Sequence, residues 1–356
     1  MLKDTLFRQF VDLCKAASGR RRFWTITTAK KQFMKAAVLK QLGEVPIYGD
    51  FPDPIPQNAD QLVLKVKAAA LKNIDKLKTA PGTYLSYREL PTVVGMDGVG
   101  VLEDGTTVYA QGITGMMAEK ALIAKGRYTI LPKGIDPALA AALPNAVLGS
   151  AMALHIRAKL KAGDTVVVNG ATGVTGKVAV QVAKHLGASR VIAIGRNEAA
   201  LKKLHALGAD EVISLNEDDK AVVHKLKEIE KQTPIDIVID YLWGRPAELL
   251  IQALRVEGPN ANMHKIKLVT VGDMAGHNMT LNSSALRSAD IEILGSGLGN
   301  LTPTDFAEFG AVILPKMFAL AVEGKLTLDT QQASLSNIHE AWHSPANGKR
   351  MVLTMD

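Results

Sequence analysis

The stretch VVVNGATGVTGK, residues 166–177, decides the fold class. It begins inside TVVVN, residues 165–169, a short apolar run of β-branched residues that is typical of a buried strand. Glycines at positions 170, 173 and 176 then permit a tight turn and a close approach of the backbone to a ligand. A helix that starts near Gly176 presents unpaired N–H groups and the positive end of its dipole, so a pyrophosphate fits there. The spacing is GxxGxxG rather than GxGxxG, and the alternative is a glycine turn without a ligand.

Downstream of this stretch, apolar runs alternate with amphipathic segments. Strands are expected at residues 190–195, 211–214, 235–240 and 266–271, with 291–295 as a further candidate, and helices at 198–207, 218–232 and 246–255. This alternation predicts a doubly wound α/β domain whose parallel sheet is covered on both faces.

Upstream of it, short strand candidates are separated by Gly and Pro. They lie at residues 35–39, 62–66, 99–102 and 107–109, and Asp104-Gly105 suits a tight hairpin turn. The pattern predicts a mostly β, barrel-like unit over residues 34–130. Residues 137–154 are expected to be helical, and the chain after residue 302 is expected to hold two helical stretches and a closing strand at 350–354.

The end of the second expected strand indicates the cofactor. Twenty residues after Gly176 the chain reads Gly195-Arg196-Asn197. NAD-binding versions of this fold place a carboxylate there for the ribose hydroxyl, whereas a guanidinium can hold a 2′-phosphate bidentately. We therefore expect NADP(H), the alternative being that Arg196 is only an exposed residue at a helix entry. Lys177 and Lys202 would add positive charge, although lysines on helix surfaces are usually just solvated.

Composition narrows the class of protein. The 356 residues are 47% hydrophobic, which suits two domains, and no apolar run is long enough to predict a membrane span. The net charge is +7, but residues 1–33 hold eight basic and two acidic residues, so the rest of the chain is nearly neutral. This balance gives no reason to expect a nucleic-acid partner. The one cysteine, Cys14, excludes an internal disulfide framework and fits a reducing, cytoplasmic location.

Residues 1–33 differ in character from the rest of the chain and form an N-terminal extension. Three interpretations stay open: a start placed too early, with Met34 as the true first residue; an Arg-rich targeting peptide, which would imply an organelle matrix; or a genuine extra element.

Several motifs together resemble a known family. They are Leu143-Pro144 before an Ala-rich helix, Ala162-Gly163-Asp164-Thr165-Val166, KHLGA at 184–188, Leu207-Gly208-Ala209-Asp210 and Ile237-Val238-Ile239-Asp240. In this order they look like the quinone oxidoreductase (zeta-crystallin-like) branch of the medium-chain dehydrogenase/reductases. The resemblance covers about residues 34–356 and is strongest over 143–240.

The resemblance implies a GroES-like catalytic domain, split into 34–155 and 291–356, around a Rossmann domain at 156–290. It implies NADPH in the cleft between them, hydride transfer to a quinone or an α,β-unsaturated carbonyl, and a homodimer. Zinc relatives carry a His-Glu pair where this chain reads Met96-Asp97, and no cysteine follows residue 14. A zinc site with a thiolate ligand therefore cannot form, and a metal-free enzyme is expected.

Without a metal, hydrogen-bond donors must stabilise the oxyanion that forms on hydride transfer. The family motif Asn-x-x-Asp aligns with Lys72-Asn73-Ile74-Asp75, so its asparagine stands one place late. Lys72, or Asn73 after a register shift, is a candidate donor to the substrate carbonyl. Tyr84 matches a tyrosine that lines the pocket in relatives. The alternatives are a solvent-facing lysine and a packing aromatic ring.

The predicted cofactor-binding residues come from the glycine loop, the second strand end and family positions near the nicotinamide. They are Asn145, Ser150, Gly170, Thr172, Gly173, Val174, Thr175, Gly176, Lys177, Gly195, Arg196, Asn197, Gly272, Gly297, Gly299 and Lys349.

Two other functions remain open. The first is reduction of enoyl thioesters, which needs a basic patch for a carrier phosphate that the sequence does not locate. The second is a nucleotide-binding protein without catalysis, either crystallin-like or RNA-binding; the near-neutral main body weighs against RNA.

Overall fold

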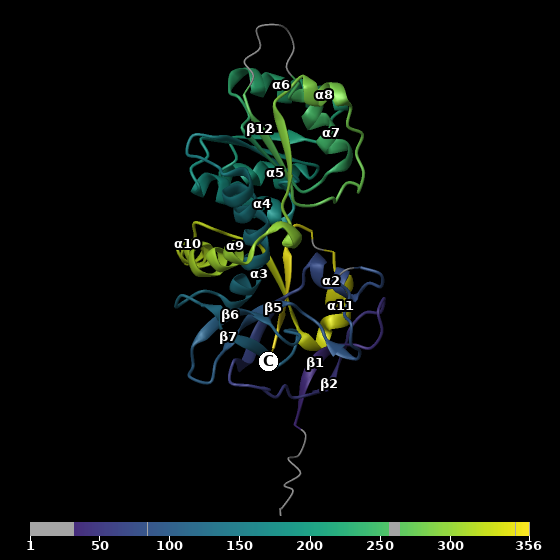
Figure 1. Ribbon diagram of the computed structural model, residues 1–356, viewed down its shortest axis with the longest axis vertical. Coiled ribbons are helices and arrows are strands. Elements are labelled where there is room, and N and C mark those ends of the chain that lie inside the picture. Colours follow the sequence, from purple (N-terminus) through teal and green to yellow (C-terminus); the bar gives the residue numbers. More distant parts are fainter. Residues whose placement is uncertain (1–31, 84, 256–263, 346, 356) are drawn as a thin grey trace, which may run out of the picture. The chain divides into compact units, whose positions relative to one another are not determined.

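The structure of the protein is a computed structural model that describes residues 32–83, 85–255, 264–345 and 347–355. The N-terminal extension, apart from residues 32 and 33, and Tyr84 lie outside the described residues. The chain from Phe33 onward forms one compact unit that contains a parallel sheet and a β-rich part (Figure 1).

The parallel sheet has six strands in the order β10-β9-β8-β11-β12-β13. Numbered along the chain this is 3-2-1-4-5-6, the arrangement of dinucleotide-binding sheets, with a crevice where the order reverses between β8 and β11. The strands are β8 (Thr165–Asn169), β9 (Arg190–Gly195), β10 (Glu211–Ser214), β11 (Ile237–Asp240), β12 (Ile266–Thr270) and β13 (Ile291–Gly295). The helices between and beside them are α4 (Val174–His185), α5 (Glu198–Leu204), α6 (Asp219–Gln232), α7 (Gly244–Ala253) and α8 (Ser283–Arg287).

The central strand β8 shows why this sheet forms. Val166 and Val168 point to the core that contains α4, whereas Val167 points to the opposite core with Leu226 of α6 and Leu250 of α7. All five residues of β8 are buried, so an uninterrupted apolar run is what a doubly covered strand requires. The doubly wound sheet predicted from the sequence is confirmed, and β13 extends it past the domain boundary expected at residue 290.

The β-rich part consists of a six-stranded sheet, ordered β14-β15-β3-β5-β6-β7 with an extra β3–β7 pairing that closes a barrel, and a small β2-β1-β4 sheet. Its strands are β1 (Phe33–Leu39), β2 (Ile47–Pro52), β3 (Gln61–Ala70), β4 (Thr92–Val93), β5 (Asp97–Val101), β6 (Thr107–Gly112), β7 (Lys120–Ile130), β14 (Thr330–Ser334) and β15 (Arg350–Thr354). The barrel-like prediction is confirmed, as is the hairpin between β5 and β6, whose Gly105 has a φ of +87°.

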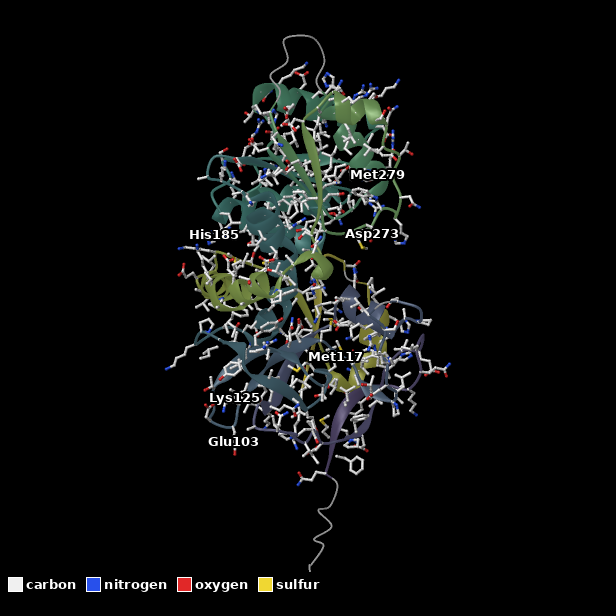
Figure 2. The ribbon with its side chains drawn as sticks, in the orientation of Figure 1. Glu103, Met117, Lys125, His185, Asp273 and Met279 are labelled. Carbon is white, nitrogen blue, oxygen red and sulfur yellow. The ribbon has the colours of Figure 1, made fainter. Side chains whose placement is uncertain are left out.

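Strands from both ends of the described chain share this sheet. The C-terminal strand β15 pairs antiparallel with β3. In Figure 1 the yellow C-terminal segment accordingly lies beside the purple and blue strands of the β-rich part. Met117 is fully buried within this part, while Glu103 and Lys125 are exposed on it (Figure 2). The sequence did not predict β2, β4, β7 or β14; β14 (TQQAS) has too few apolar residues for a periodic pattern.

A long apolar helix packs between the two sheets. It comprises α3 (Pro137–Val147) and a wider segment, η1 (Leu148–Ala158), and extends four residues beyond the expected helix. Among the described residues it is the one helix long and apolar enough to cross a membrane. Most of its apolar window is buried inside the protein, so it is a core helix.

The remaining elements are shorter. They are α2 (Asn73–Thr79), α9 (Pro303–Glu308), η4 (Phe309–Ile313), α10 (Leu314–Val322), α11 (Ile338–His343) and the single turns η2 (His205–Leu207), η3 (Leu298–Asn300) and η5 (Leu335–Asn337).

Candidate active site

A cleft of about 740 Å³ opens at the carboxyl ends of β8, β9, β11 and β12. This is the position where open α/β sheets bind their ligands. The opposite wall comes from the β-rich part, namely the start of α2, Ala341, residues 343–345 and residues 348–351. The cleft therefore combines the glycine loop with segments from both ends of the described chain.

The glycine loop is shaped for a phosphate. Gly170 has a φ of +91°, which favours glycine, and a Cβ on Gly176 would lie 2.3 Å from the carbonyl oxygen of Gly170. Only a glycine at 176 lets α4 start this close to the loop. Gly173 precedes α4 without a side-chain cap, so the first N–H groups of the helix are available to a ligand in the cleft.

Arg196 lies at the adjacent strand end. It follows Gly195, lines the cleft and is exposed. Within the described part of the chain, no carboxylate pairs with its guanidinium, and no Asp or Glu lines the cleft. A Cβ on Gly195 would lie 2.6 Å from Cγ2 of Thr172, so the strand end and the loop are in close contact.

Lys72 belongs to a buried ion cluster. Its side chain is 1% exposed, and its Nζ donates to Asp97 Oδ1 at 2.5 Å and to Ala70 O at 3.1 Å, with Asp75 Oδ2 at 3.3 Å. The Tyr109 hydroxyl donates to Asp97 Oδ2 at 2.9 Å. Three acceptors thus surround the three N–H donors of the ammonium group.

The opposite charges in this cluster stabilise one another's ionised forms. Burial would lower the pKa of Lys72, but the charges of Asp75 and Asp97 and the bond to Asp97 raise it above the ordinary 10.5. Burial raises the pKa of Asp75, although Lys72 opposes that rise. This arrangement suits Lys72 for holding the start of α2 rather than for donating to a substrate. The neighbouring Asn73 is exposed and lines the cleft, and among the described residues its amide contacts only Met274 Sδ, at 3.9 Å.

Most of the predicted cofactor residues lie together. The cleft is lined by Asn145, Gly170, Thr172, Gly173, Val174, Thr175, Gly176, Gly195, Arg196, Gly272 and Lys349, besides Lys72 and Asn73.

Five predicted residues do not line the cleft. Ser150 is fully buried and donates to Ala146 O at 2.8 Å, because its hydroxyl turns back onto its own helix. Gly149, one position earlier, lines the cleft instead. Lys177 Nζ binds Asp329 and the Gly348 carbonyl oxygen. Asn197 caps α5, and Gly297 and Gly299 lie at a surface turn away from the lining.

The sequence reasoning missed several lining residues. Arg350, Lys76 and His343 reach the cleft from the β-rich part. The signal for Arg350 was its place beside Lys349 at the start of the closing strand. Its Nε is buried with no hydrogen-bond partner, and its Nη2 is 3.4 Å from Asn145 Oδ1.

The corner after β11 holds the cleft wall in an unusual conformation. The Asp240 carboxylate accepts from the backbone N–H groups of Leu242 and Trp243 and from Asn169 Nδ2. Trp243 has a φ of +56°, which is strained for a bulky residue. Burial raises the pKa of Asp240. These bonds hold Leu242 against Gly170, where a Cβ on the glycine would be 3.1 Å away.

Metal ligands do not gather in the described structure. The sequence HEAWH at 339–343 has HExxH spacing, a pattern known from zinc sites. The two imidazoles stack edge to face with centroids 5.2 Å apart. Among the described residues, no group of three His, Cys, Asp or Glu side chains is placed to hold a metal ion.

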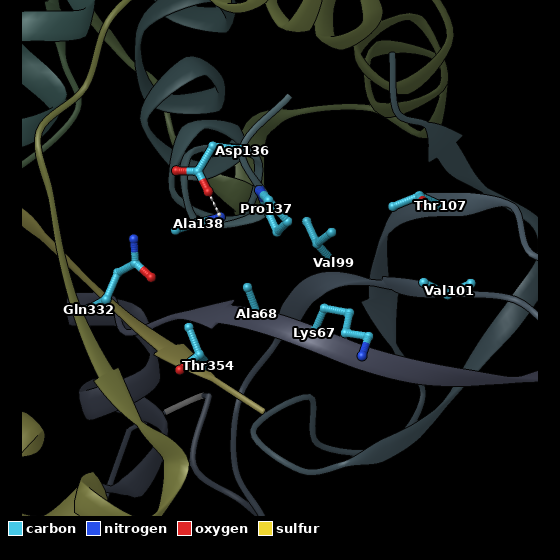
Figure 3. A pocket seen from close by; sticks show the side chains of 10 residues that line it. All are labelled: Lys67, Ala68, Val99, Val101, Thr107, Asp136, Pro137, Ala138, Gln332 and Thr354. Atoms are coloured by element: carbon cyan, nitrogen blue, oxygen red, sulfur yellow. Dashed lines mark hydrogen bonds between the residues drawn. The ribbon is translucent and has the colours of Figure 1, made fainter. Parts of the chain in front are cut away.

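A second cavity of about 390 Å³ lies between the β-rich sheet and the start of α3 (Figure 3). Val99, Ala68 and Pro137 give it an apolar lining, and the Asp136 carboxylate is engaged in capping α3. Its lining contains no glycine and no arginine, unlike that of the cleft.

Comparisons with known proteins agree with this geometry. A family model described as zinc-binding dehydrogenase matches residues 174–314. A probable NADPH-dependent quinone reductase of Emericella nidulans is 27% identical, with 86% of this chain and 96% of the relative covered. A chloroplastic NADPH-dependent alkenal/one oxidoreductase of Arabidopsis thaliana is 34% identical over 45% of this chain and 46% of the relative.

Among solved structures, the quinone oxidoreductase of Thermus thermophilus, also described in complex with NADPH, is 27% identical. It superposes with a TM-score of 0.72 over 90% of this chain and all of that one.

Proposed function

We propose that the chain transfers a hydride from NADPH to a quinone or an α,β-unsaturated carbonyl, as the quinone oxidoreductases of the medium-chain dehydrogenase/reductase superfamily do, to which it is similar. The observation that carries the proposal is the exposed Arg196 guanidinium beside the glycine loop in the cleft, which has no carboxylate partner in the described part of the chain. A dinucleotide with a 2′-phosphate meets a cation at that point, whereas one with a free ribose hydroxyl finds no carboxylate.

The residues present fit this cofactor. The start of α4 would bind the pyrophosphate, Arg196 the 2′-phosphate, and Asn145, Gly149 and Gly272 would line the nicotinamide end. When bound, NADPH supplies the hydride, which carries two electrons to the acceptor and leaves NADP⁺.

The chain itself must then stabilise the product. Hydride addition places negative charge on an oxygen of the acceptor, which needs a hydrogen-bond donor and then one proton. We assign the donor role to Asn73, because its amide has only a weak sulfur contact in the cleft. Lys72 positions Asn73 through the buried cluster at the start of α2, and solvent in the open cleft supplies the proton.

The test is a cofactor and acceptor screen with the full chain. Oxidation of NADPH and of NADH is followed with naphthoquinone, an enone and an enoyl thioester. We expect at least a tenfold preference for NADPH and turnover with the first two acceptors. Binding of NADPH without oxidation by any acceptor would leave only a non-catalytic nucleotide-binding protein.

A further inference from the structure

The charged side chains that line the cleft all have one sign. Among the described lining residues they are Lys72, Lys76, Arg196, Lys349 and Arg350, and no Asp or Glu is part of this lining. Such a cleft concentrates anions and strengthens their binding. The question is which of these cations the dinucleotide uses.

Three of the five are accounted for. Lys72 is enclosed by Asp97 and Asp75. Arg196 is assigned to the 2′-phosphate. Lys349 follows Gly348, whose carbonyl oxygen is 3.1 Å from Lys177 Nζ of α4, so Lys349 lies on the phosphate side. Lys76 and Arg350 remain, both on the wall formed by the β-rich part.

Arg350 has the properties of an unfilled binding group. Among the described residues its Nε has no hydrogen-bond partner, and the bond from its Nη2 to Asn145 is long at 3.4 Å. No carboxylate of the described residues forms an ion pair with it, although the charges of Asp75 and Asp97, which both contact Lys72, oppose the lowering of its pKa by burial. A guanidinium stays charged at neutral pH even when burial lowers its pKa. A partly buried guanidinium without a direct ion-pair partner is available to an anion in the cleft that it lines, and Lys76 lines the same cleft.

We propose that the acceptor reduced in this cleft carries an anionic group, a carboxylate or a phosphate, which Arg350 and Lys76 bind. This inference rests on the proposed function and names its substrate class. A guanidinium can donate two N–H groups to two oxygens of one anion, and Arg350 lines the cleft beside Asn145. The half-buried Lys76, one helical turn after Asn73 on α2, adds a second charge. The reducible carbonyl would then lie near Asn73.

The experiment compares matched acceptors. A naphthoquinone is set against the same quinone with a carboxylate side chain, and crotonyl-pantetheine against crotonyl-phosphopantetheine, which adds one phosphate. Calorimetry measures their binding to the protein with and without NADP⁺, and NADPH oxidation gives kcat/KM. We expect one anionic member to bind at least about tenfold more tightly than its neutral partner, as a charge-assisted contact provides. The pair that shows the preference identifies the carboxylate or the phosphate.

Variants test the assignment of the residues. Lys76→Met and Arg350→Met should each reduce the anionic-to-neutral ratio of kcat/KM severalfold, and Arg350→Lys should restore part of it. The matched control is Lys78→Met, on the same helix but outside the cleft, where its ammonium lies over the Tyr87 ring. It should keep the full ratio. Lys76 is only half-buried, so its variant remains informative if Arg350→Met does not fold.

The outcomes separate the two proposals. Equal binding of anionic and neutral partners would refute the anionic substrate even if NADPH oxidation is rapid. A weaker affinity for NADPH in Arg350→Met, with the anionic-to-neutral ratio unchanged, would also refute it and assign Arg350 to the cofactor. No oxidation with any acceptor would refute the reductase function, while calorimetry would still decide whether the cleft prefers anions.

Discussion

At the scale of single residues, Arg196 and Lys72 are both cations that line the cleft, but they differ in exposure and in their partners. Arg196 is exposed and has no carboxylate partner among the described residues, whereas Lys72 is enclosed by three oxygen acceptors. An exposed cation without a carboxylate partner is available to bind a phosphate, whereas an enclosed cation stabilises the residues that surround it. This difference leads to two predictions.

Replacing Arg196 with Met should weaken NADPH binding by about tenfold or more and leave NADH binding within about twofold. The guanidinium contacts only the 2′-phosphate in our assignment, and a charge-assisted contact is worth roughly 1.5–3 kcal/mol. Fluorescence titration of both cofactors measures the effect. If the two affinities fall together, Arg196 supports the fold of the strand end rather than the phosphate.

Replacing Lys72 with Met should destabilise the protein by about 3–5 kcal/mol, because two buried aspartates lose their cation. The pKa of Lys72 is raised in the folded state, so its stabilisation is present below 10.5 and is lost as pH rises through the higher folded value. Urea unfolding should therefore show a difference between wild type and variant that shrinks above about pH 10.5. A variant with wild-type stability and no turnover would instead make Lys72 a direct donor.

At the scale of elements, the end of η1 illustrates a local conflict. Lys159 follows this helix in the left-handed conformation, with φ +56° and ψ +50°, where glycine is the usual residue. Its backbone N–H nevertheless satisfies the Leu154 carbonyl, so the hydrogen bond of a helix end is kept. The core packing of the helix outweighs the cost of this one residue.

Lys159→Gly should therefore raise stability by about 0.5–1 kcal/mol, since relief of a non-glycine left-handed residue exceeds the entropy lost by glycine. Thermal or urea unfolding measures it. The matched control is Lys161→Gly, also exposed but without a positive φ, which should be neutral or slightly destabilising. A loss of stability in Lys159→Gly would mean that the lysine stem contributes packing that exceeds the strain.

At the scale of the whole molecule, the cleft exists because distant segments converge. Lys177 on α4 binds Asp329 and the Gly348 carbonyl oxygen, which connects the parallel sheet to the chain's C-terminal segment. His339 and His343 lie in that segment and have the spacing of a zinc motif, but no third ligand joins them among the described residues. Spacing alone does not make a metal site.

Prolonged dialysis against a chelator should therefore leave NADPH oxidation unchanged, and metal analysis of the purified protein should find zinc well below one atom per chain. The paired variant His339→Ala with His343→Ala should retain a metal content equal to that of the wild type. Loss of activity on chelation, restored by zinc, would contradict the metal-free reaction.

The sequence alone determined the strand, glycine loop and helix at 165–185 and the alternation of strands and helices that follows them. It also determined that no carboxylate stands beside Arg196 at the end of the second strand. These are local properties, because periodicity, glycine positions and strand ends are encoded in neighbouring residues. Only the tertiary structure decided which partners individual polar groups contact and how deeply they are buried. Lys72 met Asp97, 25 residues away, and Arg350 met Asn145, 205 residues away, while the Ser150 hydroxyl turned inward. The hydrogen-bond partners and the burial of a side chain depend on which distant segments pack together. A charged residue seen in the sequence therefore does not reveal whether its side chain binds a ligand or stabilises the fold.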